Sequence, residues 1–355
     1  MTVRELVQRR LAGQRLVGPP LSSPAEVVRW LGAVQAQDYR GALWGIALRT
    51  RAATEAEVER ALAGRAVVRS WPMRRTLHIV AAADLRWMLR HLASRAVRGM
   101  AGRHRALGLE PGDFVRAGRL LEKALAGGGQ LTRAEIYQLL ARGGVKPDEQ
   151  RGIHIIATLA MEGLLCFGPH RGKLPTFVLL DEWLPPAPVL DREAALAELA
   201  RRYLSSHGPA SAADLAWWAG LSLGEARAAI AGARPDVRRP PRASATAHLL
   251  PPYDEYTVAY KDRSAILDPA LVDATRGGIF SPVVVLDGRV AGIWRQKRTQ
   301  RAVAVTAELV APPTAAQRRA LEAAAARLGA FLGLPAELSA AVRRGAAAPR
   351  RRARR

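Results

Sequence analysis

The sequence reads LLCFGPHRGKLPTFVLL from residue 164 to residue 180. Two apolar runs, Leu164–Phe167 and Thr176–Leu180, enclose a basic loop that contains glycine, and this pattern is typical of a β-hairpin. An apolar stretch at Arg151–Met161 precedes them and predicts a helix. Helices followed by a hairpin are the order of a winged-helix module. The tip of its wing would carry three basic side chains: His170, Arg171 and Lys173.

Two other regions show related patterns. Residues Pro209–Ser222 lead from one helix into another through Gly220, which is a helix–turn–helix pattern. The N-terminal part predicts helices at Glu26–Val34 and Glu55–Leu62, followed by a strand at Thr76–Val80. We infer three related modules in tandem, at a spacing of about 80 residues or less.

Several helix starts carry the capping-box spacing, in which a hydroxyl residue is followed three positions later by Glu or Gln. They are Ser23, Thr54, Thr132, Ser222 and Thr314. The character of the chain changes near Arg238–Arg242, and the following strands predict a small, barrel-like β unit with an Asp287-Gly288 hairpin turn. These strands are Tyr253–Tyr260, Pro282–Leu286, Arg289–Trp294 and Ala302–Leu309. An Ala-rich helix is expected at Thr314–Leu332.

The sequence therefore predicts an α+β fold in which three tandem winged-helix motifs are followed by a small β-barrel. The expected units are 1–100 (first winged helix, with a Gln-x-Gln motif), 101–188 (second), 189–242 (third), 243–312 (β-barrel), 313–345 (C-terminal helix) and 346–355 (basic tail).

The charge of the chain points to a polyanionic partner. It has 54 Lys and Arg against 31 Asp and Glu, for a formal net charge of +23. A high-GC coding bias explains Arg in place of Lys, but it does not explain the excess of basic over acidic residues. Nucleic acid is the leading candidate partner, and the tail Arg350–Arg355 is expected to add non-specific affinity.

Several classes of protein are disfavoured. A single cysteine, Cys166, excludes an intramolecular disulfide and a cysteine-rich zinc site, and it lies in an apolar run where a buried, inert thiol is expected. The histidines do not pair at metal-ligand spacings, so we expect no metal and no cofactor. The sequence has no signal peptide and no apolar stretch long enough to span a bilayer. These features predict a cytoplasmic, nucleoid-associated protein with no membrane partner.

One polar cluster, Val34-Gln35-Ala36-Gln37-Asp38-Tyr39, follows the first capped helix. If the chain is extended here, Gln35 and Gln37 point to one side and bring two primary amides into one small volume. The alternative is a solvated polar helix end, because Gln-x-Gln is a common tripeptide.

Five segments together resemble the AlkZ/YcaQ family of winged-helix proteins, which includes DNA glycosylases that unhook interstrand crosslinks. They are Val34–Asp38, Met73–Val80, Leu249–Tyr256, Asp262–Ser264 and Gly292–Arg295, within a match from about Leu6 to about Phe331. The resemblance implies three winged-helix motifs and a β-barrel in a C-shaped molecule with a basic, concave DNA channel. It also implies that Gln35 and Gln37 are catalytic. The YcaQ-like branch has Asp at the second position, so Gln37 places the chain nearer the AlkZ-like branch.

The implied activity is that of a monofunctional DNA glycosylase that hydrolyses the N-glycosidic bond of N7-alkylguanine, with bulky adducts or interstrand crosslinks as further substrates. Alkylation at N7 makes the base cationic, so it leaves without protonation, and the protein need only position a water and stabilise an oxocarbenium-like sugar. The alternative is a non-catalytic winged-helix DNA-binding or regulatory protein. Since the modules are in tandem, we expect a monomer on double-stranded, damaged DNA.

Eight residues are candidates for DNA contact: Arg74, Arg75, His78, Arg171, Lys173, Lys261, Arg263 and Arg298. For Arg74 and Arg75 a phosphate contact is favoured over a solvated loop. For Lys261, Arg263 and Arg298, phosphate contact and simple solvent exposure are equally favoured.

Overall fold

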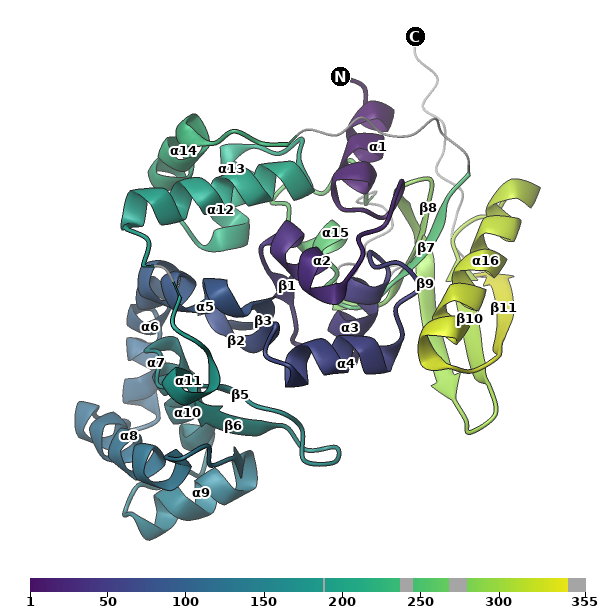
Figure 1. Cartoon of the computed structure of the whole chain (residues 1–355). Helices are drawn as coiled ribbons and strands as arrows, with labels where there is room; N and C mark the ends of the chain where they lie inside the picture. The colour runs from purple at the N-terminus through teal and green to yellow at the C-terminus, as the bar shows by residue number, and fades with distance from the viewer. Residues whose placement is uncertain (188, 237–244, 268–279, 344–355) are drawn as a thin grey trace.

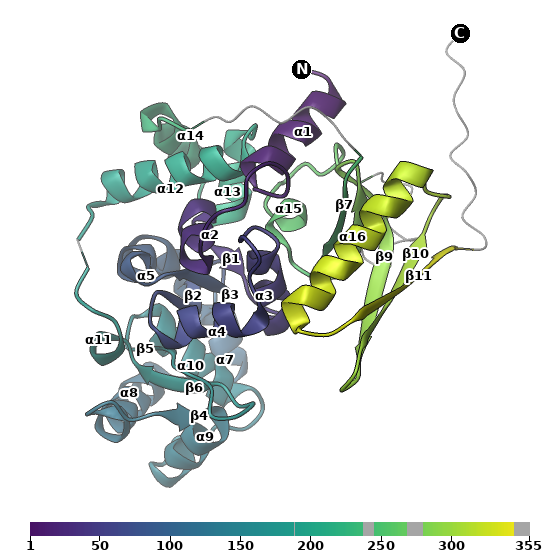
Figure 2. The same ribbon diagram turned by 45° about the vertical axis from the view of Figure 1, so that its right-hand side comes forward.

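The computed structural model describes residues 1–187, 189–236, 245–267 and 280–343. The fold is mixed α+β, with short sheets separated by runs of helices; the early elements lie in the middle of the molecule and the C-terminal sheet at one side (Figures 1 and 2). The predicted basic tail at 346–355 and the predicted boundary near Arg238–Arg242 lie outside the described residues. Within the described ranges, no helix combines the length and the apolar character that crossing a membrane requires.

The first unit, residues 24–81, follows helix α1 (Val3–Gly13). Its elements are α2 (Pro24–Leu31), β1 (Val34–Gln35), α3 (Tyr39–Ala47), α4 (Glu55–Ala63), β2 (Val67–Met73) and β3 (Thr76–Ala81). The three strands form an antiparallel sheet in the order β1-β3-β2. The capping box predicted at Thr54 is confirmed. Ser23 also caps α2, but the carboxylate of Glu26 accepts from Ser22.

The second unit, residues 111–179, repeats this order of elements. It comes after α5 (Ala82–Met88), the π-helix η1 (Leu89–Ala93), α6 (Ser94–Arg98) and α7 (Ala101–Ala106). Its elements are α8 (Pro111–Leu125), β4 (Leu131–Thr132), α9 (Arg133–Arg142), α10 (Arg151–Met161), β5 (Leu165–Phe167) and β6 (Thr176–Leu179). The sheet order β4-β6-β5 again places the last strand in the middle. The predicted bounds of α10 and the predicted hairpin are confirmed.

A third group consists of helices: α11 (Leu180–Trp183), α12 (Arg192–His207), α13 (Ala212–Ala219) and α14 (Leu223–Gly232). Helix α13 ends at Gly220 in the left-handed conformation (φ 72°), and Ser222 caps α14 with a full capping box. The predicted helix–turn–helix is therefore confirmed. No strand occurs in the described stretch 189–236 of this group.

The C-terminal unit is a five-stranded sheet in the order β11-β10-β9-β8-β7. Its elements are β7 (Ala247–Leu250), α15 (Glu255–Val258), β8 (Val283–Leu286), β9 (Arg289–Arg298), β10 (Val303–Leu309), α16 (Ala315–Leu332) and β11 (Ala336–Val342). The predicted turn at Asp287 and Gly288 is confirmed, with both residues at positive φ. Thr314 caps α16 as predicted.

Three expectations for this unit are wrong. The described strands form an open sheet, not a closed barrel, because α16 packs against one face and buries it (Figure 2). The segment Tyr253–Tyr260 is not a strand: the side chain of Asp254 accepts from the N–H of Tyr256 and starts the short helix α15. The expected helical unit 313–345 contains a strand, β11, which pairs in parallel with β10.

The sheet of the first unit lies between two apolar cores. Val67 and Ile79 face the core shared with the C-terminal unit, whereas Val68 and Val80 face the core shared with the second unit and α12–α14. This division follows from the alternation of side chains along a strand. Strand β1 of this sheet ends at Gln35, which contacts Arg74 of the first unit and Glu255 of the C-terminal unit.

Candidate active site

Gln35 is the last residue of β1, and the rest of the chain holds it on two sides. It pairs with His78 across the sheet and is 7% exposed. Its backbone N–H donates to Glu255 Oε1 at 2.8 Å, and its side-chain oxygen accepts from Arg74 at 3.3 Å. Both its main chain and its amide are thus fixed by residues distant in sequence.

Arg74 reaches Gln35 because of an unusual turn between β2 and β3. Arg74 and Arg75 both adopt positive φ, 54° and 62°, in the two-residue connection that follows Met73. Such turns usually contain Asn or Gly, because other side chains are strained there. The guanidinium bends back and donates both to Gln35 and, at 3.3 Å, to His78 Nε2. Burial lowers the pKa of Arg74, and neither of these contacts is with a carboxylate.

The protonation of His78 follows from its contacts. A guanidinium only donates, so Nε2 must accept from Arg74, and the ring proton lies on Nδ1, which contacts Thr76 O at 2.9 Å. Burial, reinforced by the nearby charge of Arg74, lowers the pKa of His78 to about 3. The ring is neutral at physiological pH. Because this side chain is fully buried, the expectation that it contacts DNA is corrected. Its role is to accept a hydrogen bond from the Arg74 guanidinium.

Gln37 is exposed, and its amide oxygen accepts from the N–H of Leu77 at 2.9 Å. Ala36, between the two glutamines, is fully buried and donates its N–H to Leu77 O at 2.7 Å. Its own oxygen accepts from Arg69. The motif is thus pinned residue by residue, with one glutamine buried at the strand end and the next accessible from outside.

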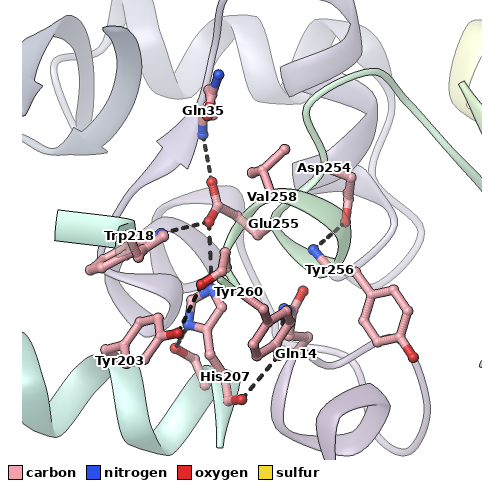
Figure 3. A network of polar contacts seen from close by, with 12 residues as sticks. Gln14, Gln35, Tyr203, His207, Trp218, Asp254, Glu255, Tyr256, Val258 and Tyr260 are labelled. Carbon is pink, nitrogen blue, oxygen red and sulfur yellow. Dashed lines mark hydrogen bonds and ion pairs between the residues drawn. The ribbon is translucent and has the colours of Figure 1, made fainter. Parts of the chain in front are cut away.

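Glu255 lies beneath Gln35 and was not identified from the sequence. Its carboxylate accepts from Gln35 and, through Oε2, from Trp218 Nε1 at 2.8 Å, and it faces His207 Nε2 at 3.5 Å (Figure 3). Burial raises its pKa, but His207 and the N–H of Gln35 outweigh burial and hold the pKa below its ordinary value. The signal that could have shown it is the acidic pair Asp254-Glu255 inside an otherwise apolar segment.

The other DNA-contact candidates are spread over several units. Arg75 is exposed and donates to Gly99 O at 3.3 Å. Arg171 pairs with Glu135 at 2.7 Å in the second unit. The remaining candidates lie in the C-terminal unit or in the wing of the second unit: Arg298 pairs with Glu55 at 2.9 Å, Arg263 lies over the ring of Trp217, and Lys173 and Lys261 are exposed. The structure thus gathers Arg74 and His78 around Gln35. Arg75 lies in the same turn as Arg74, and Arg263 is close enough to add to burial in lowering the pKa of Arg74, whereas Arg171 and Arg298 pair with carboxylates elsewhere.

Several exposed arginines on and around the helices that follow α5 were also not identified from the sequence. The contact between Arg75 and Gly99 places the end of α6 against the turn that carries Arg74. Exposed side chains on and around α6 and α7 include Arg90, Arg95, Arg98, Arg103 and Arg105. Their frequency within residues 90–105 was the available signal.

A cavity of about 390 Å³ opens beside the motif. It is lined by Asp38 and Gly41 from the start of α3, by Pro251, and by Arg295 on β9. Asp38 directly follows Gln37 and caps α3 through the N–H of Gly41. The cavity is thus lined by the residue that directly follows Gln37 and by residues of the C-terminal unit.

Comparison with known proteins gives consistent results. The family model described as DNA glycosylase AlkZ-like matches residues 28–331. A curated relative, an interstrand DNA cross-link repair glycosylase of Streptomyces sahachiroi, is 28% identical over 337 residues, which covers 82% of this chain and 87% of the relative. The solved structure of Streptomyces sahachiroi DNA glycosylase AlkZ matches with a TM-score of 0.74 and 24% identity, covering 96% of this chain and 100% of that one. The two proteins share a fold.

Proposed function

The chain belongs to the AlkZ-like DNA glycosylase family, and from this premise we propose that it hydrolyses the N-glycosidic bond of N7-alkylguanine in duplex DNA. We propose that it acts as a monofunctional glycosylase whose range includes bulky adducts and interstrand crosslinks; the Streptomyces sahachiroi relative, an interstrand DNA cross-link repair glycosylase, supports the last of these. The observation that carries the proposal is the pinned motif, in which Gln35 and Gln37 are held at one strand end. We propose these two residues as the catalytic pair.

The chemistry suits neutral amides. As the C1′–N9 bond breaks, its electron pair leaves with the cationic base, which becomes neutral. The oxygen of water then forms a bond to C1′, and the displaced proton passes to solvent. His78 is neutral and its Nε2 accepts from Arg74, so it does not serve as the acid, and the reaction needs none. The amides orient the water, which is the step that positioning can accelerate.

The proposed partner is damaged double-stranded DNA, bound by a monomer. In support, the first and second units have the element order of a winged helix, and α12–α14 would provide a third, over the ranges 1–100, 101–188 and 189–242. The turn at Arg74 and Arg75 with the arginines of α6 and α7 would contact phosphates along a basic, concave channel. The cavity beside Asp38 offers room for a large substituent on the base.

The test is incubation with a duplex that contains N7-methylguanine, followed by heat or alkali to reveal abasic sites. We expect strand cleavage at the lesion and release of the free base. Tight DNA binding without excision from any alkylated duplex would instead favour the non-catalytic regulator.

A further inference from the structure

We propose that Glu255 is the positioning residue for Gln35: its buried carboxylate holds the backbone of the catalytic strand end in place. The inference rests on the proposed function. Glu255 does not touch DNA, because its side chain is fully buried. It acts on the reaction through Gln35.

The direction of the Gln35 N–H explains why an outside acceptor is needed. In an antiparallel pair, successive N–H groups point alternately toward and away from the partner strand. The N–H of Ala36 points to β3, where it donates to Leu77 O, so the N–H of Gln35 points to the open edge of the sheet. A buried N–H without an acceptor is costly. Glu255 takes the place of a neighbouring strand.

A carboxylate suits this position better than a neutral acceptor would. Hydrogen bonds to an ionised acceptor are shorter and roughly twice as strong as neutral ones, and the distance here is 2.8 Å. The same carboxylate also accepts from Trp218 at 2.8 Å. One charged group therefore ties α13 and α15 to the end of β1 (Figure 3).

Glu255 is itself held rigidly. His207 faces it and stacks on Tyr203, with ring centroids 4.8 Å apart. Tyr203 donates to Ala259 O at 2.8 Å, and Tyr260 donates to His207 O at 3.0 Å. Both contacts fasten the C-terminal end of the short helix that carries Glu255 to α12.

A hydrolase triad is the rival interpretation, because Ser206, His207 and Glu255 follow one another in space. Ser206 Oγ donates to Arg202 O at 2.7 Å, so it can only accept from His207 Nδ1, also at 2.7 Å. All three side chains are buried. A nucleophile whose proton is already donated and which no substrate can reach does not fit hydrolysis, and the group is a support.

The decisive variant is Glu255→Gln. A primary amide offers one acceptor oxygen and an NH2 group that only donates. The N–H of Gln35 and the indole N–H of Trp218 each need an acceptor on this side chain. One of them must then meet an NH2 group. We expect the single-turnover excision rate at saturating enzyme to fall about tenfold, since a misplacement of about 1 Å can cost on the order of 10²-fold and a backbone that has lost one hydrogen bond should shift by less than that. The Kd for lesion DNA should change less than twofold.

Two comparisons separate positioning from general stability. The double variant Glu255→Gln/Trp218→Phe removes the competing donor, so the amide oxygen can turn to Gln35, and the rate should recover by several-fold relative to the single variant. Asp254→Asn is the matched control, because Asp254 is also a buried carboxylate that pairs with a distant residue, Arg49, at 2.8 Å without contacting Gln35. The oxygen of asparagine can still accept from the N–H of Tyr256, so the cap of the helix that carries Glu255 is kept. It should lower the melting temperature and leave the excision rate of the folded protein unchanged.

Hydrogen–deuterium exchange of the peptide that contains Gln35 gives a readout independent of activity. Exchange should speed up in Glu255→Gln and stay unchanged in Asp254→Asn. If the wild type excises and Glu255→Gln excises equally fast, the inference is overturned. Equal slowing by both single variants at equal stability, or no recovery in the double variant, also overturns it. If the wild type excises nothing, the proposed function fails, and unchanged exchange at Gln35 in Glu255→Gln would still refute the hydrogen bond's importance.

Discussion

The first and second units use one scaffold in two ways. By register, Val34 and Gln35 of β1 correspond to Leu131 and Thr132 of β4, since Gln35 pairs with His78 as Thr132 pairs with Thr176. In the second unit, Thr132 directly caps α9 with a capping box. The first unit places residues 36–38 between its strand and α3, and Asp38 performs the capping.

This difference frees the strand end for another use. The side chain of Thr132 accepts from the N–H of Glu135, which is a local contact at the start of its own helix. Gln35, relieved of capping, contacts Arg74 and Glu255 instead. A short insertion at the strand–helix junction thus converts a structural position into one that can carry chemistry.

The largest effect expected from this comparison is on excision. Gln35→Ala and Gln37→Ala should each slow single-turnover excision on the order of 10²-fold, because a water-positioning group acts in the transition state. Binding of lesion DNA should stay nearly normal. Thr132→Ala, the matched change in the second unit, should keep the wild-type rate. Unchanged rates in both glutamine variants would remove the catalytic assignment, and Gln37→Asp tests whether the second position sets the lesion range.

The second effect concerns acid. Burial lowers the pKa of His78 from its ordinary value of 6.5 to about 3 in the folded protein. Between about pH 3 and pH 6.5, His78 is therefore protonated in the unfolded chain and neutral in the folded protein. The free energy of unfolding should therefore fall as the pH drops below about 6.5, by up to about 1.4 kcal/mol per pH unit. Above about pH 6.5, His78 should make no contribution to its pH dependence. Urea unfolding of the wild type and His78→Asn from pH 7.5 to 5 measures this. The variant should show the shallower pH slope, and parallel slopes would contradict the buried neutral ring.

Third, loss of the cap in the second unit should be felt in stability alone. Thr132→Ala removes the acceptor for the N–H of Glu135, which typically costs about 1 kcal/mol. Thermal or urea unfolding would show the loss. A matching loss of excision in the folded variant would mean that the two units are coupled more tightly than their contacts indicate.

The smallest expected effect is a difference in DNA affinity between changes at two hairpin tips, the β2–β3 turn with Arg75 and the β5–β6 loop with Arg171. Arg75→Gln should weaken duplex binding a few-fold and reduce the salt slope by about 1, because it removes one phosphate contact beside the site. Arg171→Gln should do less, since Arg171 already pairs with Glu135. Salt titrations of both variants measure the difference. If Arg171→Gln weakened binding more than Arg75→Gln, the result would indicate that DNA lies closer to the second unit.

Local signals predicted much of this structure. The capping residues Thr54 and Thr132, the bounds of α10 and the turn at Asp287 depend on neighbours within a few positions, and the sequence displays those neighbours directly. The Gln-x-Gln motif was visible for the same reason. The residue that supports the motif was not visible in the sequence, because Glu255 contacts Gln35 from 220 positions away. In addition, Glu255 lies in a short helix where the sequence predicted a strand. Strand β11 was missed since its Ala-rich sequence has little β preference and is held by pairing with β10.

The distance along the chain between Gln35 and Glu255 also has a consequence during synthesis. A ribosome adds about 5–20 residues per second, so the acceptor for the Gln35 N–H emerges roughly 10 to 45 s after Gln35 itself. Until then the end of β1 lacks its support, and the core that the first unit shares with the C-terminal unit is incomplete. Under the proposed function, a chain that terminates before Glu255 would therefore lack the acceptor that holds the Gln35 backbone in place, and we expect it to excise no base.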